Sequence, residues 1–467
     1  FILLLVAGLL AGGAVADRTE RPSLSMPEAA ARRALMPTAA PGDALASTWF
    51  CVGATAEAGS PADGVVVVAN PTDQEAAGAV TVVPAEGEPG RTEITVAPRS
   101  TVQVRLREVK ASPHAAALVQ LDRGQVVAEL VVGGPSESDA TPCSSRASDR
   151  WYFADGVTAK DATLSLALFN PFPDDARVDL SFSTDQGRAE PSAFRPVLVP
   201  ARSIVVKDIG QHVRRREAIA TTVRVSAGRV VAAQVQTRTV GGKAGVSTAL
   251  GAPSLGTEWH FAHGLVGDGT DEHYAVYNPG RNEASVLFRV ILDDGVAEDF
   301  ERVVPAQSRL DVVLNEEVGV PRGVGHSTTV ESLNGGRVVV ARALAYAPPA
   351  PVVGRADTLG ARRAATEWVF PAGGTGGATD EYLVLSNPGD ADATVSVRAL
   401  GEASSELSGL QRVKVASGRR AQVPLREHVR RSPLPLVVTS DQPVVAERAL
   451  YQVGPFAFWA NVGIPLG

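Results

Sequence analysis

The chain has 467 residues, a net charge of -7 and charged side chains at 20% of its positions, so no strong cationic field draws nucleic acid or anionic lipid. This length predicts about two to four domains rather than one. Aromatic residues make up only 5% of the chain, and a recurring tryptophan is therefore informative.

The N-terminal segment is apolar over residues 1–16 and turns polar at Asp17. It ends in Ala14-Val15-Ala16, which has the A-x-A form that signal peptidase recognises after an apolar stretch. Residues 1–16 are predicted to be a signal peptide or a membrane anchor, although they fall short of the roughly twenty residues that span a bilayer. Residues 17–46, rich in Ala, Pro and Arg, are predicted to be a flexible linker.

Four copies of one unit follow the linker. Residues 257–279, TEWHFAHGLVGDGTDEHYAVYNP, and residues 366–388, TEWVFPAGGTGGATDEYLVLSNP, are recognisably the same block, and fainter copies begin at Trp49 and Trp151. A period of about one hundred residues matches the commonest domain size. The predicted repeats are residues 47–148, 149–256, 257–365 and 366–467.

Each repeat opens with a strand in which a tryptophan and the residue two places later share one face, because side chains alternate along a strand. That second residue is phenylalanine in three repeats and cysteine in the first. A fixed place in an alternating strand favours a core role for the tryptophan over a ligand platform. The predicted core residues are Trp49, Trp151, Phe153, Trp259, Phe261, Trp368 and Phe370.

A second strand in each repeat stops at an Asn-Pro pair, and the residues two and four places before the asparagine are always large and apolar. This alternation is typical of a half-buried strand. Asparagine nucleates a turn and proline cannot donate to a ladder, so the pair ends the strand. The predicted turn residues are Asn70, Pro71, Asn170, Pro171, Asn278, Pro279, Asn387 and Pro388.

The two cysteines, Cys51 and Cys143, both lie in the first repeat. Cys51 is in the first strand, and Cys143 is where the last strand of that repeat should end. First and last strands of a sandwich can lie near each other, so an exported protein favours a disulfide here over two buried free thiols. The chain has no Cys/His spacing typical of a zinc site or a redox motif.

About seven short strands per repeat, turn residues between them and no convincing long helix predict an all-β protein of four tandem immunoglobulin-like β-sandwich domains. The linkers between the repeats are very short. We therefore expect the four sandwiches to form a semi-rigid rod in single file.

One group of residues with chemical potential stands out, in the first loop region of the third repeat. A solvated loop is the favoured interpretation and a weak Ca²⁺ or transition-metal site the alternative, since residues three apart on a strand face opposite ways. The sequence has no nucleophile elbow and no phosphate-binding loop, so no catalytic residue, no cofactor and no metal ligand is predicted. The candidate residues are His260, His263, Asp268, Asp271, Glu272 and His273.

Two small basic clusters, Arg214-Arg215-Arg216 and Arg430-Arg431, are interpreted as solvated surface. Contact with an anionic wall polymer is the alternative.

The apolar N-terminus, the W-x-F-x-x-G and Asn-Pro repeats, the cysteine of Trp49-Phe50-Cys51 and the Ala/Arg/Val-rich composition resemble a family of secreted actinobacterial proteins catalogued only as a domain of unknown function. The resemblance covers nearly the whole chain after residue 16. It implies no established activity, substrate or catalytic residue.

Three functional classes stay open. The favoured one is a non-enzymatic structural or protein-interaction protein of the cell envelope, secreted or membrane-anchored, whose partner is an envelope protein or a wall polymer. We expect no nucleic acid partner, and membrane contact only through an uncleaved N-terminal segment. The second class is a cell-wall carbohydrate-binding array, which needs exposed aromatics among Tyr152, Tyr274, Tyr277 and Tyr382. The third is a hydrolase with an unrecognised site.

Overall fold

The computed structural model describes residues 37–134, 137–401, 407–452 and 458–466. The predicted signal peptide or anchor and most of the predicted linker lie outside the described residues. Residues 36–467 form one compact unit, and its regular structure is almost entirely β. Within the described ranges, no helix has the length and apolar character needed to cross a membrane.

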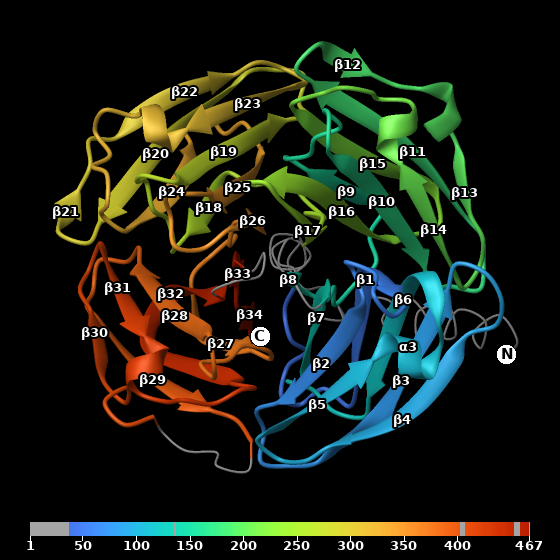
Figure 1. Cartoon of the computed structure of the whole chain (residues 1–467), viewed down its shortest axis with the longest axis horizontal. Coiled ribbons are helices and arrows are strands. Elements are labelled where there is room, and N and C mark those ends of the chain that lie inside the picture. The colour runs from blue at the N-terminus through green and yellow to red at the C-terminus, as the bar shows by residue number, and fades with distance from the viewer. Residues whose placement is uncertain (1–36, 135–136, 402–406, 453–457, 467) are drawn as a thin grey trace, which may run out of the picture. The chain divides into compact units, whose positions relative to one another are not determined.

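The first repeat is a sandwich of two antiparallel sheets, with strand orders β1-β6-β3-β4 and β5-β2-β7-β8 (Figure 1). Its elements are β1 (Ser47–Ala56), β2 (Gly64–Asn70), β3 (Ala76–Pro84), β4 (Gly90–Val96), β5 (Ser100–Arg105), α3 (Leu106–Val109), β6 (Ser112–Leu121), β7 (Val127–Gly134) and β8 (Glu137–Pro142).

The second repeat has the same plan, with orders β12-β11-β15-β9 and β14-β10-β16-β17. Its elements are β9 (Arg150–Phe153), β10 (Thr163–Asn170), β11 (Ala176–Thr184), β12 (Gly187–Ala189), η1 (Ser192–Phe194), β13 (Val197–Val199), β14 (Ser203–Asp208), η2 (Ile209–Gln211), β15 (Ile219–Ala227), β16 (Val231–Val240) and β17 (Lys243–Leu250).

The third repeat follows it closely, with orders β18-β24-β20-β21 and β23-β19-β25-β26. Its elements are β18 (Glu258–Phe261), β19 (Thr270–Asn278), β20 (Ala284–Leu292), β21 (Gly295–Val296), β22 (Phe300–Val304), β23 (Ser308–Val313), η3 (Leu314–Glu316), β24 (His326–Ser332), β25 (Val339–Tyr346) and β26 (Gly354–Leu359).

In the fourth repeat, one 17-residue strand, β32, takes part in both layers: its first half pairs with β27 and β29, and its second half pairs with β28 and β33. The elements are β27 (Ala365–Phe370), β28 (Thr379–Asn387), β29 (Ala393–Ala399), β30 (Val413–Val415), β31 (Arg419–Pro424), η4 (Leu425–Glu427), β32 (Leu436–Gln452), β33 (Phe458–Val462) and β34 (Ile464–Pro465). The prediction of an all-β chain of sandwich domains is confirmed.

The four tryptophans of the first strands, Trp49, Trp151, Trp259 and Trp368, fill the sandwich interiors, each at most 2% exposed. In every repeat the indole N–H donates a hydrogen bond of 2.8–3.1 Å to a backbone carbonyl, which directly precedes β7, β16 or β25 in the first three repeats and lies within β32 in the fourth. The indole therefore ties the first strand to the other layer while its ring is buried, which satisfies its one polar group. The accepting carbonyls belong to Val126, Val230, Val338 and Val444.

The turn asparagines are buried and saturated with hydrogen bonds. In the third repeat, the Asn278 amide donates to the carbonyls of Asn282, Val304 and Pro305 at 2.8–3.2 Å, and its oxygen accepts from the Gly280 N–H at 2.9 Å. The side chain thus fixes its own turn and the end of the neighbouring strand β22.

Replacing Asn278 by alanine is expected to lower the free energy of unfolding by about 2–3 kcal/mol, because buried carbonyls and one N–H lose their partner. Urea unfolding measures the loss. The N282A variant is the control, since Asn282 is exposed and only its backbone carbonyl takes part in the turn. Equal stability of N278A and N282A would contradict the role of the amide.

The connector between the two sheets is a single helical turn in every repeat. Each turn inserts one fully buried aliphatic residue into the core. These residues are Leu106, Ile209, Leu314 and Leu425.

The predicted disulfide between Cys51 and Cys143 is confirmed, and it joins β1 to the residue that follows β8. The other repeats place phenylalanine where the first has Cys51, and glycine directly after β17, β26 or β33. A Cβ on those glycines would lie 2.6–2.8 Å from a ring carbon of the phenylalanine. The first repeat therefore replaces a ring-on-glycine contact by a covalent bond. The three pairs are Phe153 with Gly251, Phe261 with Gly360, and Phe370 with Gly463.

The repeats are not arranged as a single-file rod, and that expectation is wrong. The last strands contact one another in the order β8, β17, β26, β33, and β33 contacts β8 again. Each apolar core also includes residues of the preceding repeat, and the core of the first repeat includes Val369, Val437 and Ile464 of the fourth. The four sandwiches therefore form a closed cycle of contacts within the compact unit.

The end of the predicted linker also belongs to this cycle. The Ala39 N–H donates to the carbonyl of Pro465 at 3.1 Å, and the carbonyls of Ala40 and Ala44 accept from Gln125 and Gly124 at 2.9 Å. Ala39 itself is buried. Residues 38–44 are therefore bound between the first and fourth repeats, which corrects the expectation of a free tether for this part of the linker.

Candidate functional site

The histidines singled out from the sequence do not gather around one point. His260 hydrogen-bonds the hydroxyl of Thr329, whereas His263 contacts the hydroxyl of Tyr451 in the fourth repeat, each at 3.1 Å. Burial, together with Arg362, lowers the pKa of His260 to about 4, and burial also keeps the pKa of His263 well below its ordinary value. Both rings are therefore neutral near pH 7 and part of the packing.

Glu272 is fully buried and belongs to a separate cluster. Its carboxylate accepts from the Leu265 N–H at 2.8 Å and the Tyr274 hydroxyl at 2.9 Å, and lies 3.1 Å from His326. Burial opposes its ionisation, but His326 and the other polar neighbours outweigh that effect and lower the pKa of Glu272 to about 2. A Cβ at Gly264 would lie 2.3 Å from the His326 ring, so glycine is required there.

The favoured interpretation of this region as a solvated loop is wrong for His260, His263 and Glu272, which are at most 5% exposed. It fits Asp268, which is exposed and pairs with Arg322, and Asp271, which is exposed. Among the residues that the structure describes, no group of three or more His, Cys, Asp or Glu side chains could hold a metal ion.

Buried carboxylates join the fourth repeat to the third repeat on one side and to the first repeat on the other. Glu447 accepts from the N–H groups of Ala262 and His263 at 2.9 Å and pairs with Arg342 of the third repeat. Glu129 of the first repeat accepts in the same way from the Ala372 N–H at 2.9 Å and from Arg448 at 2.8 Å.

The same geometry recurs because Glu129 and Glu447 occupy equivalent positions, three residues after the valine that accepts the indole hydrogen bond. The arginine one position later, Arg342 or Arg448, donates to the carbonyl of the residue four places after its own tryptophan. At each of these two junctions the glutamate bonds the neighbouring repeat, and the arginine that pairs with it also bonds a carbonyl of its own repeat.

The other two junctions use different residues for the same purpose. Asp155 of the second repeat lies 2.9 Å from Arg355 and 3.1 Å from Arg309 of the third, and the three arginines around it outweigh burial and keep its pKa well below the ordinary range. Asp139 of the first repeat accepts from the Thr248 N–H at 2.6 Å. Burial raises the pKa of Asp139 to about 8.

One buried carboxyl of the fourth repeat makes stability depend on pH. Glu381 accepts from the Gly374 N–H at 2.6 Å, and burial raises its pKa to about 7. Between about pH 4.3, where a glutamate of the unfolded chain titrates, and pH 7, the folded state keeps a proton that the unfolded state has lost. The contribution of this group to stability therefore falls as the pH rises through that window.

The E381Q variant, which stays neutral and keeps an acceptor, is expected to gain on the order of 2–3 kcal/mol over the parent between pH 5 and pH 8. Urea unfolding at several pH values measures this difference, and E427Q, at an exposed position, is the control. Parallel pH curves for the parent and E381Q would show that Glu381 does not titrate in this window.

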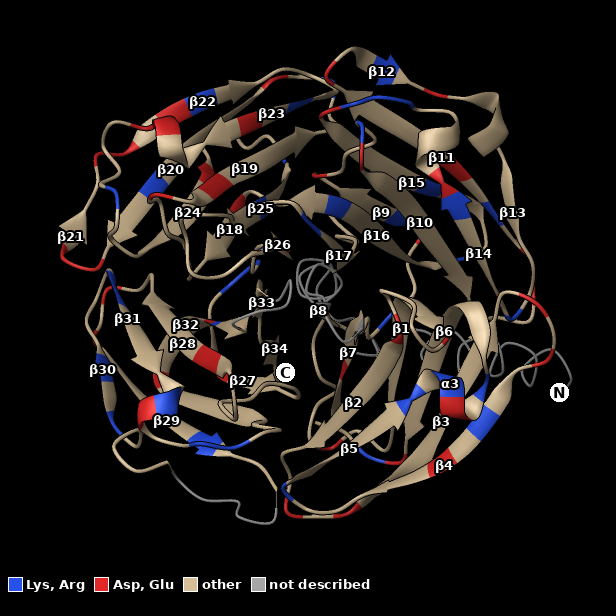
Figure 2. Cartoon of the chain, in the orientation of Figure 1, with Lys and Arg blue, Asp and Glu red and all other residues tan. Residues whose placement is uncertain are grey.

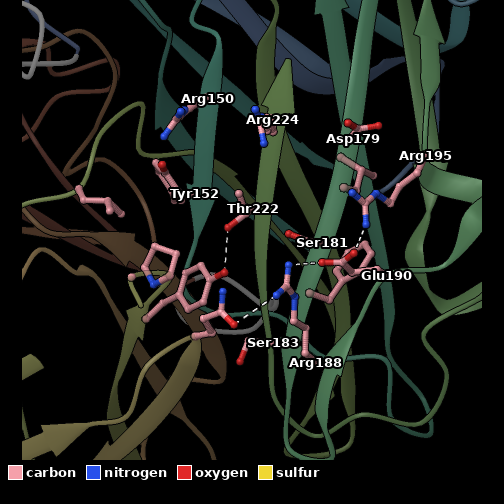
Figure 3. A pocket seen from close by; sticks show the side chains of 17 residues that line it. Arg150, Tyr152, Asp179, Ser181, Ser183, Arg188, Glu190, Arg195, Thr222 and Arg224 are labelled. Carbon is pink, nitrogen blue, oxygen red and sulfur yellow. Dashed lines mark hydrogen bonds and ion pairs between the residues drawn. The ribbon is translucent and has the colours of Figure 1, made fainter. Parts of the chain in front are cut away.

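An open groove lies between the second and third repeats, on the outward face of the sheet β12-β11-β15-β9 (Figure 3). Its volume is about 370 Å³, and its far wall is formed by Tyr277, Pro279, Gly280 and Gln307 of the third repeat. The predicted Asn-Pro turn of the third repeat therefore borders the groove.

The strand register arranges the floor of this groove in three rows. Arg150, Arg224 and Asp179 form the first row, since each is the cross-strand partner of the next. Tyr152, Thr222 and Ser181 form the second. The third contains Ser183 and, across from it on β12, Arg188.

Charges of both signs are interspersed over all four repeats (Figure 2), but the groove departs from this mixture. Four arginines and two acidic residues line it, which gives a local excess of two positive charges in a chain of net charge -7. Glu190 pairs with both Arg188 and Arg195, as Figure 3 shows. Sequence reasoning missed this site, because its residues come from separate strands and only the register brings them together.

The aromatic side chains proposed for a carbohydrate-binding array are mostly enclosed. Tyr152, Tyr274 and Tyr277 are at most 6% exposed, and the Tyr277 hydroxyl bonds Thr222 at 2.8 Å. Tyr382 is partly exposed. These side chains do not form a row of exposed rings.

Fold and sites together define a multi-sandwich β protein whose repeats are joined by buried polar contacts, with an arginine-lined groove at the junction of the second and third repeats. The chain belongs to a family of unknown function, DUF5719, whose model matches residues 124–324 and 356–454. A search of curated proteins finds no match.

Several solved structures show a limited likeness. Thermotoga maritima 1070 is 13% identical over 23% of this chain and 94% of that chain, with a TM-score of 0.21. The Anabaena sensory rhodopsin transducer is 22% identical over 19% and 94%, with a TM-score of 0.17. A tetra-tandem repeat in the extending region of a large adhesion protein is 10% identical over 90% and 100%, with a TM-score of 0.11.

Proposed function

We propose that this protein is a non-enzymatic binding or structural protein of the cell envelope, secreted or anchored outside the cytoplasmic membrane of an actinobacterium. One observation carries the proposal. The side chains with chemical potential, such as Glu272, His326, His263 and Glu447, are sealed in contacts within and between repeats, whereas accessible polar groups gather in the groove between the second and third repeats.

The compartment is supported by the disulfide, because disulfides persist outside the cytoplasm. The A-x-A sequence after an apolar segment supports export in the same way. An unknown envelope protein or a wall polymer is the partner that this location offers.

The test has two readouts on the full chain. Expressed with its own N-terminus in an actinobacterial host, the protein should be digested by protease added to intact cells, and proximity labelling should mark envelope components. Purified from that host, it should be inert across ester, peptide and glycoside substrates. Protection from external protease, or turnover that copurifies with the folded chain, would refute the proposal.

A further inference from the structure

The groove between the second and third repeats offers a ligand-binding site. We propose that it binds an acidic sugar residue, whose anionic group is held by Arg150 and Arg224 and whose hydroxyls are held by the serine and threonine side chains of the floor. This inference deepens the proposed binding function and rests on it.

The first row of the floor would bind the anionic group of the ligand. Arg224 is exposed and has neither a hydrogen bond nor an ion pair with any other side chain that the structure describes. Its neighbour Arg150 contacts the hydroxyl of Tyr152 and no carboxylate within ion-pair distance among the described residues. Asp179 stands opposite Arg224 in register without pairing with it. Two adjacent guanidinium groups that have no carboxylate partner are suited to bind two oxygens of a ligand carboxylate or phosphate.

The second and third rows of the floor would bind the hydroxyl groups of the sugar. Ser181 and Ser183 line the groove, and their hydroxyls make no hydrogen bond with the described part of the chain. Thr222 is the cross-strand partner of Ser181, and its hydroxyl pairs with that of Tyr277, where either oxygen can be the donor. A row of short hydroxyl side chains donates and accepts in every direction, which suits the hydroxyls of a sugar ring.

The size agrees with a small ligand. Ligand pockets have volumes of about 300–1,000 Å³, and this groove, at about 370 Å³, is near the lower end of that range. It therefore suits one acidic sugar or the acidic end of a glycan.

The positive charge of the groove is not a feature that every junction between repeats shares, as the junction of the third and fourth repeats shows. An equivalent groove of about 500 Å³ lies between the third and fourth repeats, bordered by the Asn387-Pro388 turn. There Arg363 faces two acidic residues, Glu258 and Asp390, so the excess is one negative charge. The groove between the third and fourth repeats therefore has no counterpart to the adjacent Arg150 and Arg224 among its lining residues.

The experiment is a ligand-observed NMR titration of the full chain with glucuronate, glucose 6-phosphate, glucose and inorganic phosphate. We expect at least one of the two acidic sugars to bind, and glucose to bind at least about tenfold more weakly. Comparing glucuronate with glucose 6-phosphate shows whether the site prefers a carboxylate or a phosphate. The R150Q/R224Q variant should lose at least about tenfold in affinity for the acidic sugar. The control is R177Q, because Arg177 is exposed on β11, another strand of the same sheet, but does not line the groove.

The S181A/S183A variant tests recognition of the sugar ring apart from recognition of the anionic group. It should lower the affinity for the acidic sugar and leave the affinity for inorganic phosphate unchanged. No binding by either acidic sugar, equal binding of inorganic phosphate and glucose 6-phosphate, or an equal loss in R177Q and R150Q/R224Q would overturn the proposal. A failure of the wider proposed function would instead appear as catalytic turnover or protease protection, which these titrations do not measure.

Discussion

Replacing Arg448 by methionine is expected to lower the free energy of unfolding by about 3–5 kcal/mol, because the carboxylate of Glu129 would stay buried without its cation. Both side chains are at most 1% exposed, and they belong to the fourth and first repeats. The Arg448 guanidinium also donates to the carbonyl of Ala372, so the same change removes a second buried partner.

Guanidinium chloride unfolding of the full chain measures this loss. R430M is the matched control, since Arg430 is exposed, and it should shift stability by less than about 0.5 kcal/mol. A loss in R448M no larger than in R430M would mean that the contact between Arg448 and Glu129 does not form in solution.

Removing the disulfide is expected to have an effect of similar size. Cys51 and Cys143 are 92 residues apart, and in the chain-entropy model a loop of this length contributes about 4–5 kcal/mol. The C51A/C143A variant should therefore unfold at a clearly lower denaturant concentration than the oxidised parent.

The reduced parent provides the control for the change of side chain, and it should lose stability nearly as much as C51A/C143A. An oxidised parent that is no more stable than its reduced form would contradict the structural role of the bond. The position of the bond explains the prediction, because it joins the two layers of the first repeat where the other repeats have a phenylalanine ring on a glycine.

Within one repeat, the sequence carried most of the structural information. The alternation before each Asn-Pro pair, the fixed tryptophan and the cysteine spacing are local patterns, and the strands, the sandwich class and the disulfide agree with them. Local periodicity predicts these features because it reflects which face of a strand is buried.

The closed cycle of repeats could not be predicted in the same way. Glu129 and Arg448 are 319 residues apart. In a strand whose side chains alternate between two faces, each would be interpreted from sequence as an ordinary surface charge. A signal did exist in the first strands. Phe50 and Val52 alternate with Trp49 and Cys51, so both faces of β1 are apolar, and the outward face packs against the second repeat. A strand with two apolar faces requires cover on both sides.

The groove was missed for a related reason. Arg150 and Arg224 are far apart in the chain, and only the pairing of β9 with β15 makes them neighbours. The histidines of the third repeat attracted attention instead, because His260, His263 and His273 are close in sequence. The structure places their side chains in separate contacts, with Thr329, Tyr451 and Asp155 respectively.

The central claim is that the first and fourth repeats are in direct contact, and a double-mutant cycle between Glu129 and Arg448 tests it most directly. The free energies of unfolding of the parent, E129Q, R448M and E129Q/R448M give the coupling between the two side chains. We predict a coupling of about 2 kcal/mol or more, because R448M should lower the free energy of unfolding much less once Glu129 is neutral. A coupling within about 0.5 kcal/mol of zero, as expected for E129Q combined with R430M, would contradict the closed arrangement of the four repeats.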